Sequence, residues 1–376
     1  MAEHPNEQHE PKRSPLWRRL VSKHPFRRGT LLVLLGLVVE YLVLPQIAGV
    51  GHSLHLLRRV NVGFVVLGVL LEVASLASYA KLTKTVLPQR ASRFSRIWRI
   101  DLSTLAVSHI LPGGTAGGDG LGYRLLTNEG VSGSDAGLAL AIQGIGSALV
   151  LNALLWMALI VSIPLTGFNP IYVTAAIIGA LLLAAFAGLV FFLTRGEERA
   201  AIVLRNLVTR LPFLKQSVAD TADRVVHQIA ARIRIMAADR ALLRRAVLWA
   251  AANWLLDAAS LFVFLAAFGH IENPDGLLVA YGLAYVLAAM PVTPGGLGVV
   301  EGVLVPSLVG FGATRAVAIV AVIGYRLVNF WLPIPVGAGA YLSLASGGLR
   351  GAERREKLRR AVADAQSPAP LAPPSG

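Results

Sequence analysis

Apolar residues in this chain come in long runs that alternate with short polar segments. Six runs are each about twenty residues or longer, the length of helix that crosses the ~30 Å hydrocarbon layer of a membrane. They cover residues 30–50, 62–80, 136–165, 171–194, 246–268 and 316–345. The pattern predicts an all-α polytopic membrane protein with about six full transmembrane helices.

Two further apolar regions, residues 102–126 and 277–311, are interrupted near their middle by proline and glycine. The pieces on either side are about eleven to fourteen residues long, so each helix would reach only ~16–21 Å at 1.5 Å per residue. No piece is long enough to cross the hydrocarbon layer alone. Each region is therefore predicted to form a re-entrant helical hairpin, although two short helices that cross and return would give the same topology.

Lysine and arginine are concentrated in four polar segments that flank these runs. The segments are residues 12–28, 81–99, 195–245 and 350–360, and they hold thirty of the 35 basic residues. Segments rich in Lys and Arg face the cytoplasm in membrane proteins. All four segments then lie on the cytoplasmic side, so an even number of crossings separates each from the next. The spans at 136–165 and 171–194 already give an even number between residues 99 and 195, so the first hairpin must return to the cytoplasmic side, whereas the second lies between the spans at 246–268 and 316–345 and must return to the outside. The two hairpins are therefore predicted to enter from opposite faces, with both termini cytoplasmic.

The two interrupted regions share a repeated pattern. The matching features are Pro112-Gly113-Gly114 with Pro294-Gly295-Gly296, Asp119-Gly120 with Glu301-Gly302, and the helix-capping hydroxyls of Ser134 and Thr314. The first two pairs lie 182 residues apart, and the third pair lies 180 apart. With opposite entry sides, this pattern is typical of an inverted-topology repeat. A chance match is the alternative, since the chain holds 37 glycines and 20 prolines.

Glycine-rich loops at this depth have two interpretations. Irregular backbone survives inside a bilayer only where it is buried in protein or lines a wet cavity. Glycine lets the backbone approach a ligand closely, and the helix after each loop would direct its N-terminal N–H groups at an anion such as a phosphate. The alternative is that the glycines only allow neighbouring helices to pack closely.

Ionisable residues inside the predicted spans and hairpins are the main candidates for function. They are Glu40, Glu72, His109, Asp119, Arg124, Asp257, Glu301 and Arg326. A charged side chain costs about 2.5–3.5 kcal/mol at mid-bilayer on insertion scales, so each is expected to face the protein interior or a substrate path. Arg326 is the strongest candidate, either as a forked donor to a phosphate or as the partner of Glu301 or Asp257 in a structural ion pair.

The two loop carboxylates, Asp119 and Glu301, also have two interpretations. Each sits in the first turn of a predicted helix, where a carboxylate favours the helix dipole. Each could instead balance a cationic headgroup or carry a proton. The predicted substrate-binding set, which joins these charges to the glycine loops, is Gly113, Gly114, Asp119, Arg124, Asp257, Pro294, Gly295, Gly296, Gly298, Glu301 and Arg326.

Composition narrows the function classes. The 376 residues are 55% hydrophobic and 15% charged, with a mean hydropathy of +0.62, which excludes a disordered chain and disfavours a water-soluble enzyme. The net charge of +14 lies between apolar runs rather than on an aromatic-bearing stripe, so no nucleic-acid partner is predicted. The absence of cysteine rules out disulfides and thiolate metal sites, and no metal or cofactor is predicted. The Arg-, Ala- and Gly-rich composition indicates a GC-rich bacterial genome. The predicted location of this multi-pass protein is the plasma membrane.

These features divide the chain into five parts. They are a basic cytoplasmic tail at 1–29, a first membrane half at 30–194 with a re-entrant loop at 101–128, a cytoplasmic amphipathic linker at 195–245, a second membrane half at 246–345 with a re-entrant loop at 277–311, and a basic then disordered tail at 346–376. The linker is expected to lie on an anionic lipid surface, because its apolar residues recur at helical spacing among basic ones. A solvated linker is the alternative.

The second interrupted region carries a family resemblance. The run from Pro291 to Glu301, PVTPGGLGVVE, followed by a helix with Tyr325-Arg326, resembles the signature of the lysylphosphatidylglycerol synthase transmembrane region family of flippase-like membrane proteins. The likeness covers roughly residues 30 to 345. In the first region the family has Pro-Gly-x-x-Gly-Glu followed by Arg, where this chain has Asp119 and Arg124. An arginine that the family places early in the next helix is missing, and Gln143 stands nearby.

The resemblance implies that the chain moves a phospholipid or a lipid-linked headgroup between leaflets, with an anionic or phosphate-bearing headgroup as its substrate. The alternatives are a membrane-embedded enzyme or accessory subunit of a glycosyl or phosphoryl transferase, and an ion-coupled carrier of a small solute. No clustered metal set, nucleotide loop or Ser/His/Asp arrangement in the sequence supports an enzyme. The chain ends soon after its last predicted span, so we expect lipid synthesis to require a separate enzyme. A second copy of the chain is a further candidate partner.

Overall fold

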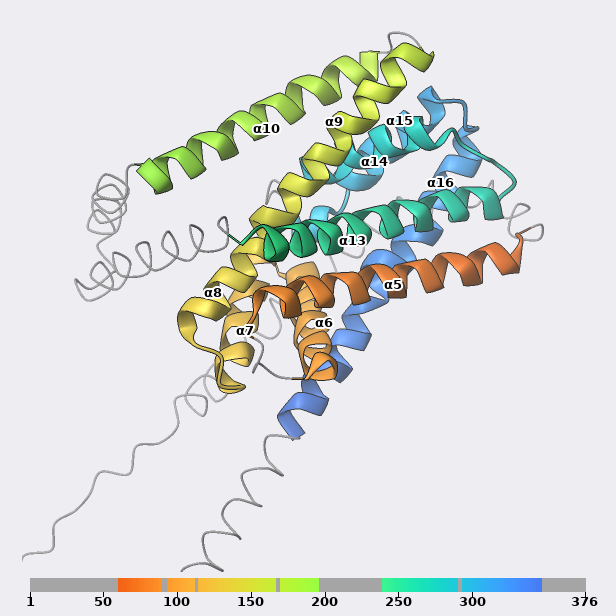
Figure 1. Cartoon of the computed structure of the whole chain (residues 1–376). Helices are drawn as coiled ribbons and strands as arrows, with labels where there is room; N and C mark the ends of the chain where they lie inside the picture. Colours follow the sequence, from red (N-terminus) through yellow and green to blue (C-terminus); the bar gives the residue numbers. More distant parts are fainter. Residues whose placement is uncertain are drawn as a thin grey trace, which may run out of the picture. The chain divides into compact units, whose positions relative to one another are not determined.

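A computed structural model describes residues 60–88, 93–111, 114–166, 170–195, 239–289 and 293–346. Every regular element in these ranges is helical, as Figure 1 shows. The chain divides into two compact units, Met1–Gly51 and His52–Gly376, and all described residues belong to the second. The predicted N-terminal tail, the span at 30–50, most of the linker and nearly all of the C-terminal tail lie outside the described residues.

The described elements follow one another as helices and short helical turns. In chain order they are α5 (Val62–Val86), α6 (Phe94–Ile110), α7 (Gly114–Asn128), α8 (Gly133–Ala141), the π-helical η3 (Ile142–Gly146), α9 (Ser147–Thr166), α10 (Pro170–Arg195), α13 (Arg240–Ala267), α14 (Pro274–Ala288), the 3₁₀ turn η4 (Pro294–Gly296), α15 (Val299–Gly310), α16 (Arg315–Arg326) and the π-helical η5 (Leu327–Trp331). Helical turns continue after η5 to residue 346.

Four helical stretches in the described ranges are long and apolar enough to cross a membrane. They are Val62–Val86, Gly133–Pro164, Arg240–Ala267 and Arg315–Ser346. Each coincides with a predicted span, and together they make the second unit a multi-pass membrane domain. The predicted span at 171–194 forms the single helix α10.

Helices α5 and α13 pack side by side in opposite directions (Figure 1). At one end the backbone N–H of Asn61, the N-cap of α5, donates to the carbonyl oxygen of Ala267 at 3.0 Å. At the other end Leu82 packs against Ala246 near the start of α13. We call the end with Leu82 and Ala246 the basic end, and the end with Asn61 and Ala267 the opposite end.

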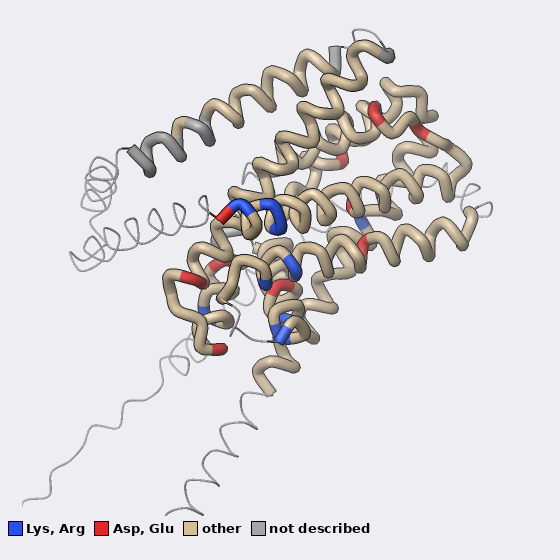
Figure 2. Tube along the Cα trace, in the orientation of Figure 1, with Lys and Arg blue, Asp and Glu red and all other residues tan. Residues whose placement is uncertain are grey.

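Basic residues gather at the basic end, where α5 ends and where α6 and α13 begin (Figure 2). The Lys81 ammonium lies 4.8 Å from the centre of the Phe94 ring in α6 and 5.9 Å from the centre of the Trp249 ring in α13. The fold thus brings together two basic segments that the positive-inside rule assigns to one side of a membrane.

The first interrupted region folds into two helices, α6 and α7, that pack against each other. Helix α6 begins at Phe94, before the predicted boundary at 101, because Ile97 and Ile100 give its first turns an apolar face that is buried in the domain. An ion pair of 2.7 Å between Arg96 and Glu129 joins the start of α6 to the end of α7. This hairpin therefore opens at the basic end.

Glycine allows the two helices of this first hairpin to approach closely. A Cβ atom at Gly118 of α7 would lie 2.8 Å from the carbonyl oxygen of Thr104 in α6, which is closer than real side chains pack. The packing interpretation of the glycines therefore applies at Gly118. Residues 112–113, which separate α6 from α7 in the sequence, lie outside the described part.

The second interrupted region also folds into two packed helices, α14 and α15, which are joined through the turn η4. Helix α14 begins shortly after α13 ends at Ala267. A Cβ atom at Gly276 in its first turn would lie 3.1 Å from the ring of Phe311, which follows α15. This hairpin therefore opens at the opposite end. Residues 290–292, before η4, lie outside the described part.

The closed ends of the two hairpins meet inside the domain. In the last turn of α6, His109 Nδ1 donates to the carbonyl oxygen of Phe330 at 3.0 Å, and the two rings stack with their centroids 4.4 Å apart. A Cβ atom at Gly295 in η4 would lie 3.2 Å from the same imidazole ring. The tip of the first hairpin thus touches the loop of the second.

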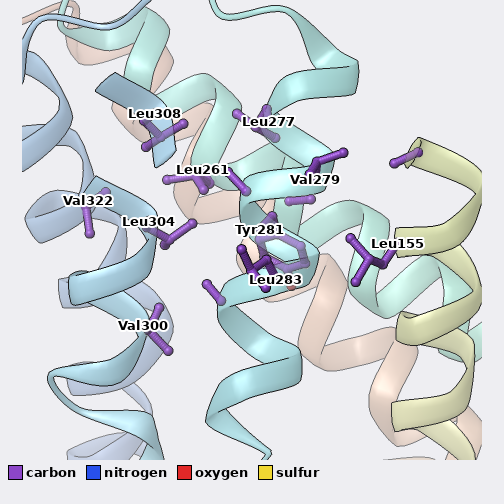
Figure 3. Packing of buried hydrophobic residues seen from close by; sticks show 14 of the residues in the cluster. Leu155, Leu261, Leu277, Val279, Tyr281, Leu283, Val300, Leu304, Leu308 and Val322 are labelled. Atoms are coloured by element: carbon purple, nitrogen blue, oxygen red, sulfur yellow. The ribbon is translucent and has the colours of Figure 1, made fainter. Parts of the chain in front are cut away.

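Helix α14 lies within the largest apolar core of the described domain. Figure 3 shows its side chains between Leu155 of α9 and Leu304 of α15, with Tyr281 among them. Because apolar side chains cover α14 on more than one face, the Tyr281 ring has little freedom. Its hydroxyl is consequently fixed in position among the charged groups described below.

Helix boundaries in the two halves recur at the offset seen in the sequence. Helix α8 begins after its N-cap Ser132 and α16 after its N-cap Thr314, 182 residues apart. Helices α7 and α15 end at residues 128 and 310, which is the same offset. The predicted cap Ser134 is wrong. The Ser132 hydroxyl accepts the Asp135 N–H at 3.1 Å and donates to its carboxylate at 2.6 Å, so Asp135 completes a reciprocal cap one turn into the helix.

Candidate functional site

Eight polar side chains meet where α5, α13, α14, α15 and α16 come together beside the turn η4. They are Glu72 of α5, Asp257 of α13, Tyr281 and Tyr285 of α14, Glu301 of α15, Tyr325 and Arg326 of α16, and Asn329 of η5. We call them the polar cluster. Arg326 is 3% exposed, and Glu72 and Asp257 are 2% and 4% exposed. Charges at such depth require partners inside the protein.

The guanidinium of Arg326 is held by three hydrogen bonds and an aromatic ring. Nε donates to Glu301 Oε1 at 2.6 Å, Nη1 to Asn329 Oδ1 at 3.3 Å, and Nη2 to the carbonyl oxygen of Gly295 at 3.3 Å. The guanidinium carbon lies 4.5 Å from the centroid of the Phe330 ring. Of the two partners considered from the sequence, Glu301 and Asp257, Arg326 forms its ion pair with Glu301.

Glu301 combines two functions at the first turn of α15. Its Oε2 accepts the backbone N–H of Gly298, the N-cap of α15, at 2.7 Å, while Oε1 accepts from Arg326. A carboxylate in this turn also interacts favourably with the helix dipole. Glu301 thereby joins the arginine of α16 to the loop that precedes α15.

The loop before α15 depends on glycine. Pro294 begins the turn, and Gly295 and Gly296 follow with φ angles of +53° and +71°, which residues with side chains rarely adopt. A Cβ atom at Gly295 would also collide with the Phe330 ring. Glycine therefore lets the backbone come close enough to present the Gly295 carbonyl oxygen to Arg326.

Asn329 connects the two acidic parts of the polar cluster. Its Oδ1 accepts from Arg326 Nη1 at 3.3 Å and lies 3.1 Å from the Tyr285 hydroxyl oxygen. Its Nδ2 donates to Glu72 Oε1 at 3.2 Å and to Asp257 Oδ1 at 3.0 Å. Asn329 lies in the π-helical η5, and π-helical turns within α-helices are frequent at functional sites.

Asp257 accepts hydrogen bonds on both carboxylate oxygens. The Tyr281 hydroxyl donates to Oδ2 at 2.6 Å. The Tyr325 hydroxyl donates to Oδ1 at 2.7 Å, where Asn329 also donates. The hydroxyls of Tyr285 and Tyr325 are hydrogen-bonded to each other. Hydrogen bonds of this kind stabilise a carboxylate that is buried away from water.

Glu72 is less completely bonded than Asp257. Its Oε1 accepts from Asn329, while its buried Oε2 has no hydrogen-bond donor among the described residues. The carboxyl group of Asp257 is its immediate neighbour. A buried polar atom that lacks a partner costs about 1–3 kcal/mol, so the environment of Oε2 calls for an explanation.

The polar cluster contains more acidic than basic groups. It holds three carboxyl groups, those of Glu72, Asp257 and Glu301, and one guanidinium, that of Arg326. Arg326 and Glu301 balance each other as an ion pair, while hydroxyl and amide groups donate to the other two carboxyl groups. An anion that approached Arg326 would have to compete with Glu301.

The structure gathers part of the predicted substrate-binding set. Arg326, Glu301 and Asp257 belong to the polar cluster, and Gly295 and Gly298 supply backbone groups to it. Pro294 and Gly296 shape the adjoining turn.

The predicted residues of the first loop are placed differently. Gly113 lies outside the described residues, and Gly114 begins α7. Asp119 and Arg124 are exposed on α7 and form no ion pair with each other in the described part. The polar cluster does not include either residue.

Sequence reasoning missed the neutral members of the polar cluster. Tyr281 with Tyr285, and Tyr325 with Asn329, are each four residues apart, so each pair lies on one face of its helix. Two polar side chains on one face of an otherwise apolar helix could have indicated that these residues face a polar site. Glu72 was recognised as a buried charge, but its position beside Asp257 depends on how α5 packs against α13.

A smaller polar group lies in the first half, between α5, α6 and η3. The Thr83 hydroxyl donates to Asp101 Oδ2 at 2.8 Å, and Gln143 Nε2 donates to the same hydroxyl. All three residues are buried. Gln143, near the place where the family resemblance leads one to expect an arginine, therefore takes part in a hydrogen-bonded group rather than an ion pair.

Comparison with known proteins gives the family of the chain. The family model described as the lysylphosphatidylglycerol synthase TM region matches residues 30–337, which include every member of the polar cluster. The chain belongs to this family. The family match and the four apolar helices together establish a multi-pass membrane protein.

Relatives of similar length occur in other organisms. A UPF0104 membrane protein of Methanothermobacter thermautotrophicus is 23% identical over 328 residues, which cover 83% of this chain and 94% of the relative. A UPF0104 membrane protein of Pyrococcus horikoshii is 22% identical over 320 residues, which cover 82% and 94%. A protein of Synechocystis is 34% identical over 113 residues, or 28% and 32% of the two chains. Two of these organisms are archaea, so a bacterial origin stays a prediction.

Proposed function

We propose that the chain moves the headgroup of a membrane lipid between leaflets and that Arg326 holds the headgroup phosphate. The observation that carries this proposal is a guanidinium buried where two helical hairpins meet. Burying an ion costs several kcal/mol, and apolar side chains of similar volume often replace a buried ion pair without loss of stability. An ion pair inside a membrane domain is therefore better explained by function than by stability.

In the proposed cycle a lipid phosphate replaces Glu301 on Arg326. Carboxylate and phosphate oxygens fit the same forked guanidinium donors. Glu301 is the more accessible member of the pair, with 11% of its side chain exposed against 3% for Arg326. The released Glu301 carboxylate would still accept the Gly298 N–H at the start of α15. Glu301 thus occupies the phosphate position when no lipid is bound.

We further propose that the hairpins are re-entrant and form an inverted repeat. The first hairpin opens at the basic end and the second at the opposite end, which supports entry from opposite faces. The recurring offset of 182 residues between helix boundaries supports a repeat. With the predicted span at 30–50 and α10 added to the four long helices, about six full crossings would place both termini in the cytoplasm.

The proposed location and partners follow from the charges. The basic end would face the cytoplasmic leaflet of the plasma membrane, and the segment 195–245 would lie on anionic lipid. The family description names lysylphosphatidylglycerol synthase, which favours a phosphate-bearing glycerophospholipid as the substrate. A separate lipid-synthesising enzyme and a second copy of the chain remain proposed partners.

Lipid exchange in reconstituted vesicles tests the proposed function. The full chain is inserted into vesicles that contain a trace of fluorescent phosphatidylglycerol, and an impermeant reductant is added outside. We expect inner-leaflet fluorescence to be lost faster than in empty vesicles. Arg326→Ala should abolish the exchange, and Arg326→Lys should restore little of it because an ammonium lacks the planar fork. Arg315→Ala, at an exposed position on the same helix, is the matched control and should keep it.

Further variants and readouts separate the alternatives. Because Arg326→Ala leaves Glu301 unpaired, the double variant Arg326→Met with Glu301→Gln removes both charges at similar volume, and we expect it to fold without exchanging lipid. Exchange at the wild-type rate in either variant would refute the assigned function of Arg326. Chemical turnover of the lipid would favour a membrane-embedded enzyme, and uptake of a soluble solute without lipid exchange would favour a solute carrier.

A further inference from the structure

We propose that the carboxyl groups of Glu72 and Asp257 share one proton and that this pair is the proton-binding site of the transport cycle. The shared proton is inferred from Asn329 Nδ2, which donates to both carboxyl groups, from the unbonded Oε2 of Glu72, and from the proximity of the two carboxyl groups. Its use in transport rests in addition on the proposed lipid exchange. The two statements are therefore tested separately.

The donors around Asp257 identify it as the acceptor of the pair. An ionised carboxylate has about four lone-pair positions. Three of those on Asp257 are occupied by donors, the hydroxyls of Tyr281 and Tyr325 and the amide of Asn329. One position is left, and the Glu72 carboxyl group is its neighbour. Asp257 is thus arranged to receive one further hydrogen bond.

Glu72 has the complementary arrangement. Its Oε1 already accepts from Asn329 at 3.2 Å, and its Oε2 has no donor within the described ranges. If Oε2 carries the proton, it becomes a donor and can bond the Asp257 carboxylate. A single proton on Oε2 would then give this oxygen of Glu72 a hydrogen-bond partner and would fill the fourth lone-pair position of the Asp257 carboxylate. The same proton removes the repulsion between two buried negative charges.

A proton fits this site better than a metal cation does. A metal cation needs several free oxygen ligands. Both oxygens of Asp257 already accept from tyrosine or asparagine, and Glu72 Oε1 accepts from Asn329. Only Oε2 of Glu72 lacks a donor in this pair. Across the described residues, no group of three or more His, Cys, Asp or Glu side chains is placed to hold a metal ion.

The pair is surrounded by groups of fixed charge. The titratable and charged groups that face it are Tyr281 and Tyr285 of α14, Tyr325 and Arg326 of α16, and Glu301 of α15 behind Arg326. The tyrosines act as neutral hydroxyl donors, a guanidinium stays protonated, and Glu301 is held by Arg326. Within the polar cluster, gain or loss of a proton is therefore assigned to Glu72 and Asp257.

Asn329 couples this proton to Arg326. Its amide nitrogen bonds both carboxyl groups, and its amide oxygen accepts from Arg326. When the proton leaves, a second negative charge appears beside Asn329 and holds Arg326 more strongly inside the polar cluster. When the proton is bound, Arg326 is easier to transfer to an incoming phosphate. We therefore expect the proton and the phosphate-bearing headgroup to bind together.

Infrared difference spectroscopy tests the shared proton without any lipid substrate. The purified full chain is measured in detergent at neutral pH, where a protonated carboxyl group gives a C=O stretch that shifts in D₂O. We expect this band in wild type and a fall in its intensity by one carboxyl group in Glu72→Gln. Glu301→Gln is the matched control and should keep the band, because Glu301 is the ionised partner of Arg326. Equal spectra for wild type and Glu72→Gln would overturn the shared proton.

Thermal unfolding tests which residue carries the proton. Glu72→Gln should leave the midpoint nearly unchanged, because an amide N–H can donate to Asp257 as the protonated carboxyl does. Asp257→Asn should lower the midpoint by several degrees, because three donors would then face an amide with a single acceptor oxygen. The reverse order would overturn the assignment. A midpoint raised by Na⁺ over K⁺ in wild type, but not in Glu72→Gln, would replace the proton by a metal cation.

The pH dependence of lipid exchange tests the coupling. With fluorescent phosphatidylglycerol as the probe, exchange by wild type should become faster as the pH falls, and Glu72→Gln should show a flat profile. A flat wild-type profile with normal exchange would overturn the coupling. Absence of exchange at every pH would instead refute the proposed function, while the infrared band would still decide the shared proton.

Discussion

Each interrupted region places an acid in the helix after its glycine loop, but the two acids have different surroundings. Asp119 is exposed on α7, whereas Glu301, 182 residues later, caps α15 and holds a buried guanidinium. The next helix shows the same contrast. In the first half Gln143 bonds to Thr83 beside Asp101, and in the second half Arg326 bonds to Glu301.

The presence of a buried arginine therefore accounts for the concentration of charged groups in the second half. Once Arg326 is buried, Glu301 must lie against it as the counter-charge, and the η4 backbone must supply the Gly295 carbonyl oxygen. Without an arginine, the first half satisfies Asp101 with a hydroxyl and an amide. We infer that the first half mainly supports the fold, while the second half carries the ionic chemistry.

The largest expected effect is on Arg326. Its replacement by alanine should lower the free energy of unfolding by about 3–5 kcal/mol, because Glu301 is left as an unpaired, largely desolvated charge and the packing of the buried guanidinium is lost. Denaturant titration of the purified protein in micelles measures this. Arg315→Ala should change stability by no more than about 0.5 kcal/mol, since the side chain is exposed. Equal effects of the two substitutions would break the distinction between a buried and a surface arginine.

A smaller effect is expected for the glycine loops. Gly295→Ala should destabilise the protein by about 2–4 kcal/mol, because it adds a left-handed backbone penalty to a collision with Phe330. Gly120→Ala in α7 has open space around the new methyl group and should stabilise the helix by up to about 1 kcal/mol. The same unfolding measurement compares both. A harmless Gly295→Ala would show that the η4 turn is not needed in this form.

The first-half polar group gives the next prediction. Thr83→Val removes the hydroxyl that donates to Asp101 and accepts from Gln143, and should cost about 1–3 kcal/mol. Lipid exchange per folded molecule should not change, because this group lies apart from Arg326. Loss of exchange at full stability would assign the first half a direct function and remove the asymmetry between the halves.

The smallest effect is expected at Asp119. Asp119→Asn should alter stability by less than about 0.5 kcal/mol and leave lipid exchange unchanged, because the side chain is exposed and lies outside the polar cluster. Glu301→Gln, at the equivalent position of the second half, should impair exchange. Similar impairment by both variants would mean that the two loop acids have equivalent functions.

Hydrophobic runs and charge spacing predicted much of the fold. Four predicted spans coincide with long apolar helices, and both interrupted regions break next to their Pro-Gly-Gly sequences. The start of α6 was predicted at residue 101 instead of Phe94. The first turns of the helix contain arginines beside the buried Ile97 and Ile100, and a sequence of this kind is typical of a polar connection. The Ser134 cap was wrong because choosing among nearby hydroxyls depends on Asp135, which bonds Ser132.

The candidate site could be predicted only in part. The motif led to Arg326, Glu301 and the Gly295 loop, because rare charges and clustered glycines stand out in apolar sequence. The bonds of Asn329 to Glu72 and Asp257 could not be predicted, since they join α5, α13 and η5 across long sequence separations. Helical periodicity gives the face on which a side chain lies, but tertiary packing decides which faces meet.

Single-cysteine labelling in sealed vesicles tests the opposed hairpins most directly, and the chain has no native cysteine to interfere. Cysteine is placed at exposed positions near the open ends, Ser95 and Asn128 for the first hairpin and Ile271 and Val309 for the second. We predict that an impermeant thiol reagent labels the first pair from one side of the membrane and the second pair from the other. Labelling of the two ends of one hairpin from different sides, or of all four positions from the same side, would contradict the proposed arrangement.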